Sequence, residues 1–227
     1  MNYVLDLGVI YDNYVPLLVA TGKTLTITFL SCIMGTLFAL PIVFLLCSRI
    51  TLLRSLSTAF VVIVRGVPLM VSLIFTYYFL PGFLGFHVAP SLVAIAVFSI
   101  YLSSFVADVL RGNAGAIPRD IIDQYLCLGM TPNQVNLTIV VPDMIRRSFP
   151  AIWNLYITLL KYSTMASVIT VDELFRTGDL IVIGKYKPIE IYGAIALIFI
   201  LIVLCMSSLG RYLEGTNLLR VEPRRTT

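Results

Sequence analysis

Residues 108–147 read DVLRGNAGAIPRDIIDQYLCLGMTPNQVNLTIVVPDMIRR and form a hydrophilic island in the middle of the chain. On both sides lie long apolar runs that contain few or no charged residues. An α-helix needs roughly 20 apolar residues to cross the hydrocarbon of a bilayer. The island is therefore predicted to be a polar connection between membrane-spanning helices, and its regular pattern indicates a docking surface.

The composition of the whole chain supports a membrane location. The 227 residues are 59% hydrophobic and 12% charged, and the mean hydropathy is +0.95. Soluble domains carry about 25% charged residues. The apolar runs are continuous and do not alternate with polar residues, which favours helical spans over a β-barrel. We expect an all-α integral membrane protein with a single transmembrane domain over residues 1–227.

Five spans are expected from the apolar runs. Residues 1–21 are predicted to be an amphipathic or irregular lead-in near one membrane surface, and residues 172–190 a second polar loop. The segment Arg65-Gly66-Val67-Pro68 is predicted to break the second span, because proline cannot donate a backbone hydrogen bond. The expected spans are residues 25–47, 58–80, 91–107, 148–171 and 191–210.

The distribution of lysine and arginine predicts the orientation of these spans. Four such residues fall on one side: Lys23, Arg176, Lys185 and Lys187. Eleven fall on the other side: Arg49, Arg54, Arg65, Arg111, Arg119, Arg146, Arg147, Arg211, Arg220, Arg224 and Arg225. Basic residues accumulate on the cytoplasmic side of membrane proteins. The island and the C-terminus are thus expected in the cytoplasm and the N-terminus outside, in a multi-pass protein of the bacterial cytoplasmic membrane.

No pattern of catalytic or metal-binding residues emerges from the sequence. The four cysteines have no paired spacing and are expected to be small buried apolar residues: Cys32, Cys47, Cys127 and Cys205. His87 is the only histidine. Gly22-Lys23-Thr24 resembles the end of a phosphate-binding loop, but position 17, where that loop needs glycine, is Leu17. We expect no enzyme activity, metal or cofactor on this chain.

The island is predicted to contain two short helices. The apolar spacing after Pro118 indicates an amphipathic helix that Gly129 ends, because glycine adopts positive φ readily. Thr131, Pro132 and Gln134 fit the start of a second helix with a capping box. Pro142 ends that helix or begins the next element. By these features alone, the island is either a well-built connection between spans or a docking device.

The spacing within the island resembles the cytoplasmic signature of ABC-importer permeases, which is Glu-Ala-Ala, three residues, Gly, nine residues, Ile, any residue, Leu-Pro. Here the corresponding residues are Asp123, Gln124, Tyr125, Gly129, Ile139, Val141 and Pro142. Further motifs of the polar amino acid branch of that family are similar to residues 22–28, 64–69, 111–112, 117–118, 159–161, 163–164 and 166–169. The match covers roughly residues 15–215.

This resemblance implies the type I ABC importer permease fold, with five spans and a cytoplasmic helix-turn-helix coupling loop at residues 108–147. It implies a permease subunit that passes a polar amino acid, of histidine, arginine, glutamine or opine type, delivered by an external solute-binding protein. Its partners would be a second permease subunit, identical or homologous, and two ATPase subunits that hold ATP and Mg²⁺. The residues that would contact the ATPase are Asp123, Gln124, Tyr125, Gly129, Met130, Thr131 and Pro132.

Lys161 is the most informative residue within the spans. A lysine at the centre of a bilayer costs about 2.5–3.5 kcal/mol on insertion scales unless it meets a polar partner or water. Lys161 therefore either pairs with a neighbouring helix or lines the solute path. The family commonly has an acidic residue at the next position, where this chain has Tyr162.

Three further residues are assigned to the solute path beside Lys161 and Tyr162. Ser163 and Thr164 carry hydroxyl groups that bind either the solute or the backbone of their own helix. Arg65 is either a cytoplasmic anchor or a gate residue.

Two other classes of function were weighed against an ATP-driven importer. An ion-coupled secondary transporter or channel would need several acidic residues in the spans or an inverted repeat, and Lys161 is the only deeply placed charge. A membrane anchor for an enzyme assembly would leave Lys161 without a role. Only the importer predicts that an ATPase purifies together with this chain.

Overall fold

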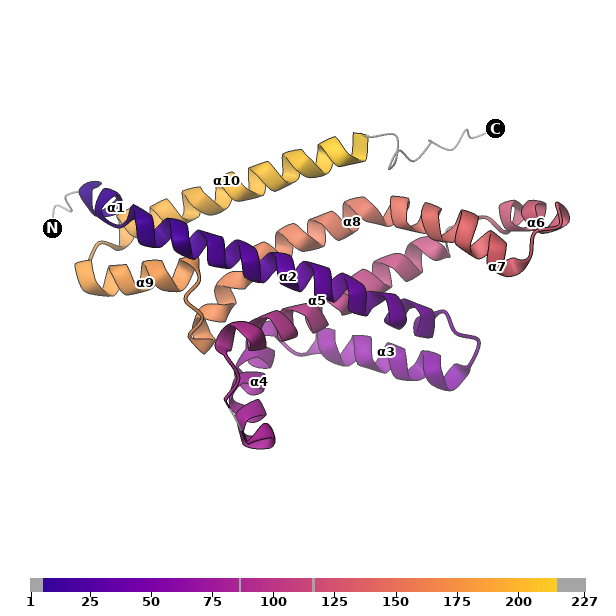
Figure 1. Cartoon of the computed structure of the whole chain (residues 1–227), viewed down its shortest axis with the longest axis horizontal. Coiled ribbons are helices and arrows are strands. Elements are labelled where there is room, and N and C mark those ends of the chain that lie inside the picture. Colours follow the sequence, from indigo (N-terminus) through magenta and orange to yellow (C-terminus); the bar gives the residue numbers. More distant parts are fainter. Residues whose placement is uncertain (1–5, 86, 116, 216–227) are drawn as a thin grey trace.

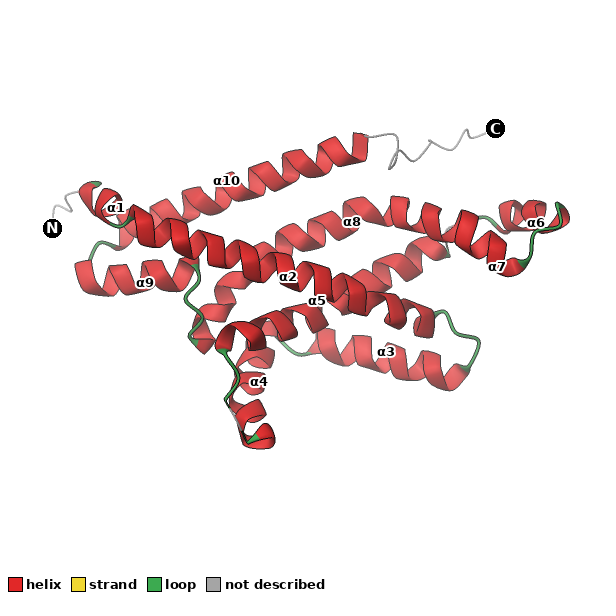
Figure 2. Ribbon diagram, viewed as in Figure 1, coloured by secondary structure: helices red, strands yellow, loops and turns green. Residues whose placement is uncertain are grey.

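The computed structural model describes residues 6–85, 87–115 and 117–215. Every regular element in these ranges is helical (Figure 2). Three of the eleven arginines that were assigned to the cytoplasmic side lie outside the described residues: Arg220, Arg224 and Arg225. The elements are α1 Gly8–Asp12, α2 Tyr14–Leu46, α3 Thr51–Gly66, α4 Leu69–Leu84, α5 Pro90–Ala114, α6 Arg119–Cys127, α7 Pro132–Val135, the π-helix η1 Asn136–Val140, α8 Val141–Tyr162, the 3₁₀-helix η2 Ser163–Ile169, α9 Leu174–Lys185 and α10 Pro188–Gly215.

The long helices lie along one axis, with α6 and α7 at one end and α1 and α9 at the other (Figure 1). Three of them, α2, α5 and α10, are long and apolar enough to span a membrane. Helices α3 and α4 together meet the same criterion, but they are bent by 99° at the break between them. Helix α8 is not among these candidates; its 22 residues include Asp143, Arg146, Arg147 and Lys161.

The centre of the fold is the packing of α2 against α5. Small residues occur at this contact: the hydroxyl of the buried Ser99 on α5 lies 3.5 Å from the carbonyl oxygen of the buried Ser31 on α2. A Cβ atom at Gly35 would lie 3.0 Å from both the Leu102 side chain and the Ser99 carbonyl oxygen. Small side chains let the backbones of membrane helices approach closely, so that van der Waals contact holds them together.

The predicted break in the second span is confirmed, although the helices on either side differ from the expected 58–80. Val67 is extended, at φ −88° and ψ 126°, because the ring of Pro68 disfavours the helical conformation in the residue before it. Helix α3 begins at Thr51, seven residues before the expected start.

The first helix is also longer than expected. Residues 14–21 were predicted to belong to an irregular lead-in, but α2 begins at Tyr14 and continues without interruption. Pro16 falls in its first turn, where the missing N–H has no helical partner to lose. The lead-in prediction is wrong from residue 14 onward, and only the five-residue helix α1 remains separate from α2.

The fourth expected span, residues 148–171, differs at both ends. Helix α8 begins at Val141, with Pro142 in its first turn, and ends at Tyr162. Residues 163–169 then form a 3₁₀-helix that ends at Thr170 with φ +64°. The hydroxyl groups of Ser163 and Thr164 donate to carbonyl oxygens three residues earlier.

Two more expectations need correction. The second polar loop, 172–190, contains the helix α9, whose first N–H groups are capped by Glu173. Of the four cysteines that were expected to be buried, only Cys32 is buried, while Cys47, Cys127 and Cys205 are exposed in this single chain. The reason is that a membrane protein presents apolar residues, small ones included, to lipid and to other subunits as well as to its own core.

Candidate solute path and coupling region

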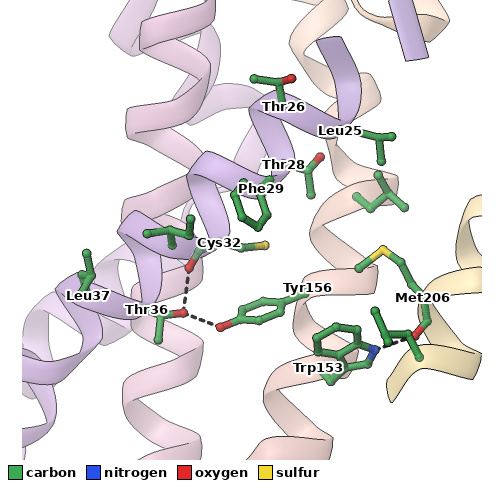
Figure 3. Close-up of a pocket in the computed structure, with 13 residues that line it drawn as sticks. Leu25, Thr26, Thr28, Phe29, Cys32, Thr36, Leu37, Trp153, Tyr156 and Met206 are labelled. Carbon is green, nitrogen blue, oxygen red and sulfur yellow. Dashed lines mark hydrogen bonds between the residues drawn. The ribbon is translucent and has the colours of Figure 1, made fainter. Parts of the chain in front are cut away.

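Helix α8 uses three of its faces for contacts within the chain. The Tyr156 hydroxyl forms a 2.6 Å hydrogen bond with Thr36 Oγ1 on α2. Trp153 Nε1 donates a 2.8 Å hydrogen bond to the Met206 carbonyl oxygen on α10, and Figure 3 shows both contacts. The third face packs on α5 through Leu159, which is buried.

The remaining face of α8 is open and polar. Asn154 and Lys161 are exposed and Thr158 is partly exposed. Residues three and four apart on a helix share one face, so these three side chains form a stripe. A polar stripe cannot face lipid without a large cost, so it must face water or another protein.

Lys161 lies near the middle of the membrane-spanning layer. The ring of Tyr162, the next residue, makes an edge contact with Tyr101, at 6.3 Å between ring centroids. Tyr101 is residue 12 of the 25 in α5, which places it roughly 16–20 Å from either end of that helix. No ion pair or hydrogen bond joins the Lys161 side chain to another part of the described chain.

The hydroxyl groups of Ser163 and Thr164 are bonded within their own helix, although Thr164 remains partly exposed. Ser163 is buried, and its hydroxyl donates to the Leu160 carbonyl oxygen at 2.7 Å. Thr164 Oγ1 donates to the Lys161 carbonyl oxygen at 2.9 Å. Both hydroxyls therefore bond the backbone of their own helix, which is the second of the two alternatives expected from the sequence.

Arg65 is held against α5 at the end of α3. Its Nη1 donates to Asp108 Oδ2 at 3.0 Å, and its Nη2 donates to the Ser104 carbonyl oxygen at 2.7 Å. Its guanidinium lies 4.4 Å from the centroid of the Phe105 ring, and its Nε is buried without a partner in the described chain. Asp108 also pairs with Arg111 at 3.1 Å. These contacts attach the end of α3 to the C-terminal half of α5.

An aromatic wall connects Arg65 to Tyr162. Phe105 lies under the Arg65 guanidinium, and its ring is 4.9 Å from that of Tyr101, which contacts Tyr162 in turn. A small cavity of about 80 Å³ opens along this wall between α5 and α8. The sequence did not single out Tyr101 or Phe105, because nothing local distinguishes them from other aromatic residues in a span.

A larger cavity of about 760 Å³ lies between α2, α8 and α10 (Figure 3). Its lining is mostly apolar, with Phe29 and Cys32 among the residues from α2. The hydroxyls of Thr36 and Tyr156 bond each other. This cavity offers few free polar groups to a polar solute, so the open face of α8 is the better candidate for a solute path.

The two predicted features of the island are present. Helix α6 ends before Gly129, whose φ is +87°, and the Met130 N–H donates to the Tyr125 carbonyl oxygen at 3.2 Å. The capping box before α7 has both of its bonds, from the Thr131 N–H to Gln134 Oε1 at 2.8 Å and from the Gln134 N–H to Thr131 Oγ1 at 3.4 Å.

The surface of this turn is exposed and partly apolar. Asp123, Gln124, Thr131 and Pro132 are exposed. Leu128, next to Gly129, has 78% of its surface exposed. Leu137, in η1, is 71% exposed as well.

Comparison with known proteins identifies relatives over nearly the whole chain. The family model described as "Binding-protein-dependent transport system inner membrane component" matches residues 31–216. The nopaline transport system permease protein NocM of Agrobacterium fabrum is 26% identical over 214 residues, covering 90% of this chain and 89% of the relative. The glutamine transport system permease protein GlnP of Escherichia coli is 28% identical over 202 residues, covering 88% and 92%.

Two solved structures share the fold. A chain from the crystal structure of an amino acid ABC transporter with histidines superposes with a TM-score of 0.87 at 27% identity, covering 93% of this chain and 99% of that one. A chain of the inward-facing MetNI methionine ABC transporter superposes with a TM-score of 0.73 at 21% identity, covering 87% and 94%.

Proposed function

The chain belongs to the family of binding-protein-dependent transport system inner membrane components, and from this premise we propose that it passes a polar amino acid or a related small solute along the open face of α8. It is a multi-pass permease subunit of an ABC importer rather than an enzyme. The observation that carries the proposal is the polar stripe of Asn154, Thr158 and Lys161 at mid-depth. The names of relatives that transport nopaline and glutamine support a solute of this class.

In the proposed topology the chain crosses the membrane five times, through α2, the bent pair α3 and α4, α5, α8 and α10. Helix α8 spans despite its charges because its polar stripe faces the solute path and not lipid. The excess of arginine near α6 and at the ends of α3 and α10 supports a cytoplasmic position for that end of the bundle. The N-terminus then lies outside and the C-terminus in the cytoplasm.

The turn between α6 and α7 is proposed to dock on a pair of ATPase subunits, which bind ATP and Mg²⁺. The contacting residues would be Asp123, Gln124, Tyr125, Gly129, Met130, Thr131 and Pro132. Gly129 fixes the direction of α6 relative to α7, since a side chain at φ +87° is strained. Closure of the ATPase pair would move this turn and rock the spans, which alternates access to Lys161.

Two further partners complete the proposed assembly. A second permease subunit, identical or homologous, would cover the open face of α8 and close the path from the other side. An external solute-binding protein would deliver the solute to the outer end, where residues 172–190 carry both acidic and basic side chains.

The test compares Gly129→Leu with Gly112→Leu in the complete transporter in proteoliposomes. Both glycines have open space where the side chain would go, but only Gly129 has positive φ. The Gly129 variant is expected to hydrolyse ATP without solute uptake, because the turn no longer fits the ATPase. The Gly112 variant should transport normally. Normal coupling in the Gly129 variant, or the absence of any ATPase in the purified transporter, would contradict the proposal.

A further inference from the structure

Negative charge is absent from the middle of the membrane layer in this chain. The sequence has no aspartate or glutamate between Asp12 and Asp108, and none between Asp143 and Asp172. These two intervals contain α2, α3, α4 and most of α5 and α8. At mid-depth the wall of the path therefore offers one ionisable side chain with a full charge, Lys161.

Three acidic residues toward the ends of the path have cationic partners, and a fourth, Glu214 on α10, lines a cavity with Asn154 and Arg211 about two helical turns from Lys161. Asp143 accepts a hydrogen bond from Arg147 Nε at 2.6 Å on the same helix. Asp172 is paired with Arg176 at 3.2 Å. These residues lie toward the two ends of the path, and Asp108 is likewise held by Arg65. None of the three carboxylates is left to hold a cationic solute.

Glu173 is the remaining acidic residue close to η2, and it also faces away from the path. It is fully buried. Its two carboxylate oxygens accept the N–H groups of Phe175 and Arg176 at 2.8 and 2.7 Å, as the cap of α9. Its role is to hold the start of a helix, so it leaves the charge of the path unchanged.

Lys161, in contrast, has a free ammonium group. Its side chain is exposed on the open stripe and has no partner in the described chain. The neighbouring Thr158 hydroxyl donates to the Asn154 carbonyl oxygen at 2.9 Å, and no hydrogen bond joins it to the Lys161 ammonium in the described chain. An ammonium provides three donors that match a carboxylate. In a second copy of this chain, the same position would add another lysine to the path.

We propose that this path selects solutes with more carboxylate than ammonium groups, so that amino acids or amino-acid conjugates of net negative charge are preferred and basic amino acids are disfavoured. The inference rests on the proposed function and adds the sign of the solute's charge. Lys161 supplies the attraction, because a charge-assisted hydrogen bond is stronger than a neutral one where water is partly excluded. The aromatic rings of Tyr101 and Tyr162 bound the site beside it.

The experiment measures binding of L-glutamate, L-glutamine and L-lysine to the purified transporter in detergent without the external binding protein, whose own selectivity would mask that of the path. Glutamate and glutamine have nearly the same shape and differ by one negative charge. Glutamate is expected to bind about ten-fold more tightly than glutamine, a difference of 1.4 kcal/mol. Lysine is expected to bind more weakly than both.

Three variants assign the preference to Lys161. Lys161→Met should reduce glutamate binding to the level of glutamine, whereas Lys161→Arg should retain the preference. Lys23→Met removes an equal charge from an exposed position on α2 and should change nothing. Equal binding of the three amino acids, tighter binding of lysine, or a preference that survives Lys161→Met would overturn the inference.

A separate measurement distinguishes a failure of the inference about charge from a failure of the proposed function. ATP-driven uptake of a mixture of labelled amino acids is measured with the binding protein present. Uptake of any amino acid upholds the proposed function, and the binding measurements made without the binding protein then decide the inference about charge by themselves. If no amino acid is taken up, the proposed function fails as well.

Discussion

Replacing Arg65 by glutamine is expected to loosen the bend between α3 and α4. Arg65 is the last charged residue before the break and makes two hydrogen bonds to α5, with Asp108 at 3.0 Å and the Ser104 carbonyl oxygen at 2.7 Å. It also lies over the Phe105 ring at 4.4 Å. Because Val67 and Pro68 are not helical, these side-chain contacts hold the end of α3 to α5.

The magnitude follows from these contacts. Hydrogen bonds to charged groups contribute about 1.5–3 kcal/mol each, and a cation–π contact adds about 0.5–1 kcal/mol. Solvent weakens the pair, since the Arg65 and Asp108 side chains are 28% and 37% exposed. Asp108 also keeps its bond with Arg111, so no carboxylate is left unpaired. We therefore expect a loss of about 2 kcal/mol, below the sum of the separate contacts.

The assay is denaturant unfolding of the purified protein in detergent, with Arg54→Gln as the matched control. Arg54 lies on the same helix with an exposed side chain, and its replacement should change stability by less than about 0.5 kcal/mol. A double-mutant cycle with Asp108→Asn should give a coupling of about 1 kcal/mol. Equal stabilities of the Arg65 and Arg54 variants, or strict additivity in the cycle, would refute the reasoning.

Three further outcomes are expected. Gly210→Ala should destabilise the protein by about 1–3 kcal/mol, because the new methyl group would collide with the Trp153 indole. The fluorescence of Trp153, the single tryptophan, should shift as well. Gly193→Ala on the same helix is the control, because its methyl group would meet open space. Burial raises the pKa of Glu173 to about 7, so the folded state binds more protons than the unfolded state between about pH 4.5 and 7. The melting temperature should therefore fall as pH rises through this window. Glu173→Gln should make the melting temperature less dependent on pH in the same window. Thr131→Ala removes the cap of α7, worth about 1 kcal/mol, and hydrogen exchange should become faster there and unchanged in α2.

The features that the sequence predicted correctly depend on local chemistry. Pro68 prevents helix in the residue before it whatever the surroundings are. Gly129 and the capping box at Thr131 also act within a few residues, and both are present in the structure. The apolar runs also predicted the positions of α2, α5 and α10, the three helices of the described chain that are long and apolar enough to span a membrane.

The ends of the helices were predicted less well. In the 3₁₀ segment after Tyr162, Ser163 and Thr164 donate their hydroxyls to the backbone, as Ser103 and Ser104 do within the regular helix α5. The same residues also occur in regular helices, so their presence alone does not predict the change. Helix α9 was missed because its cap, Glu173, lies in a stretch rich in charged residues that is typical of a loop.

The sequence by itself determined the class of the protein, the number of apolar runs, the break at Pro68 and the turn at Gly129. The tertiary structure decided which face of each helix is buried, and so it alone placed Lys161 on an open stripe and Ser163 in the interior. It also paired Arg65 with Asp108 across 43 positions of sequence. Membrane helices are apolar on nearly all sides. The periodicity that marks the buried face of a soluble helix is therefore weak in their sequences. Which face of a membrane helix is buried depends on its contacts with helices that are distant in sequence.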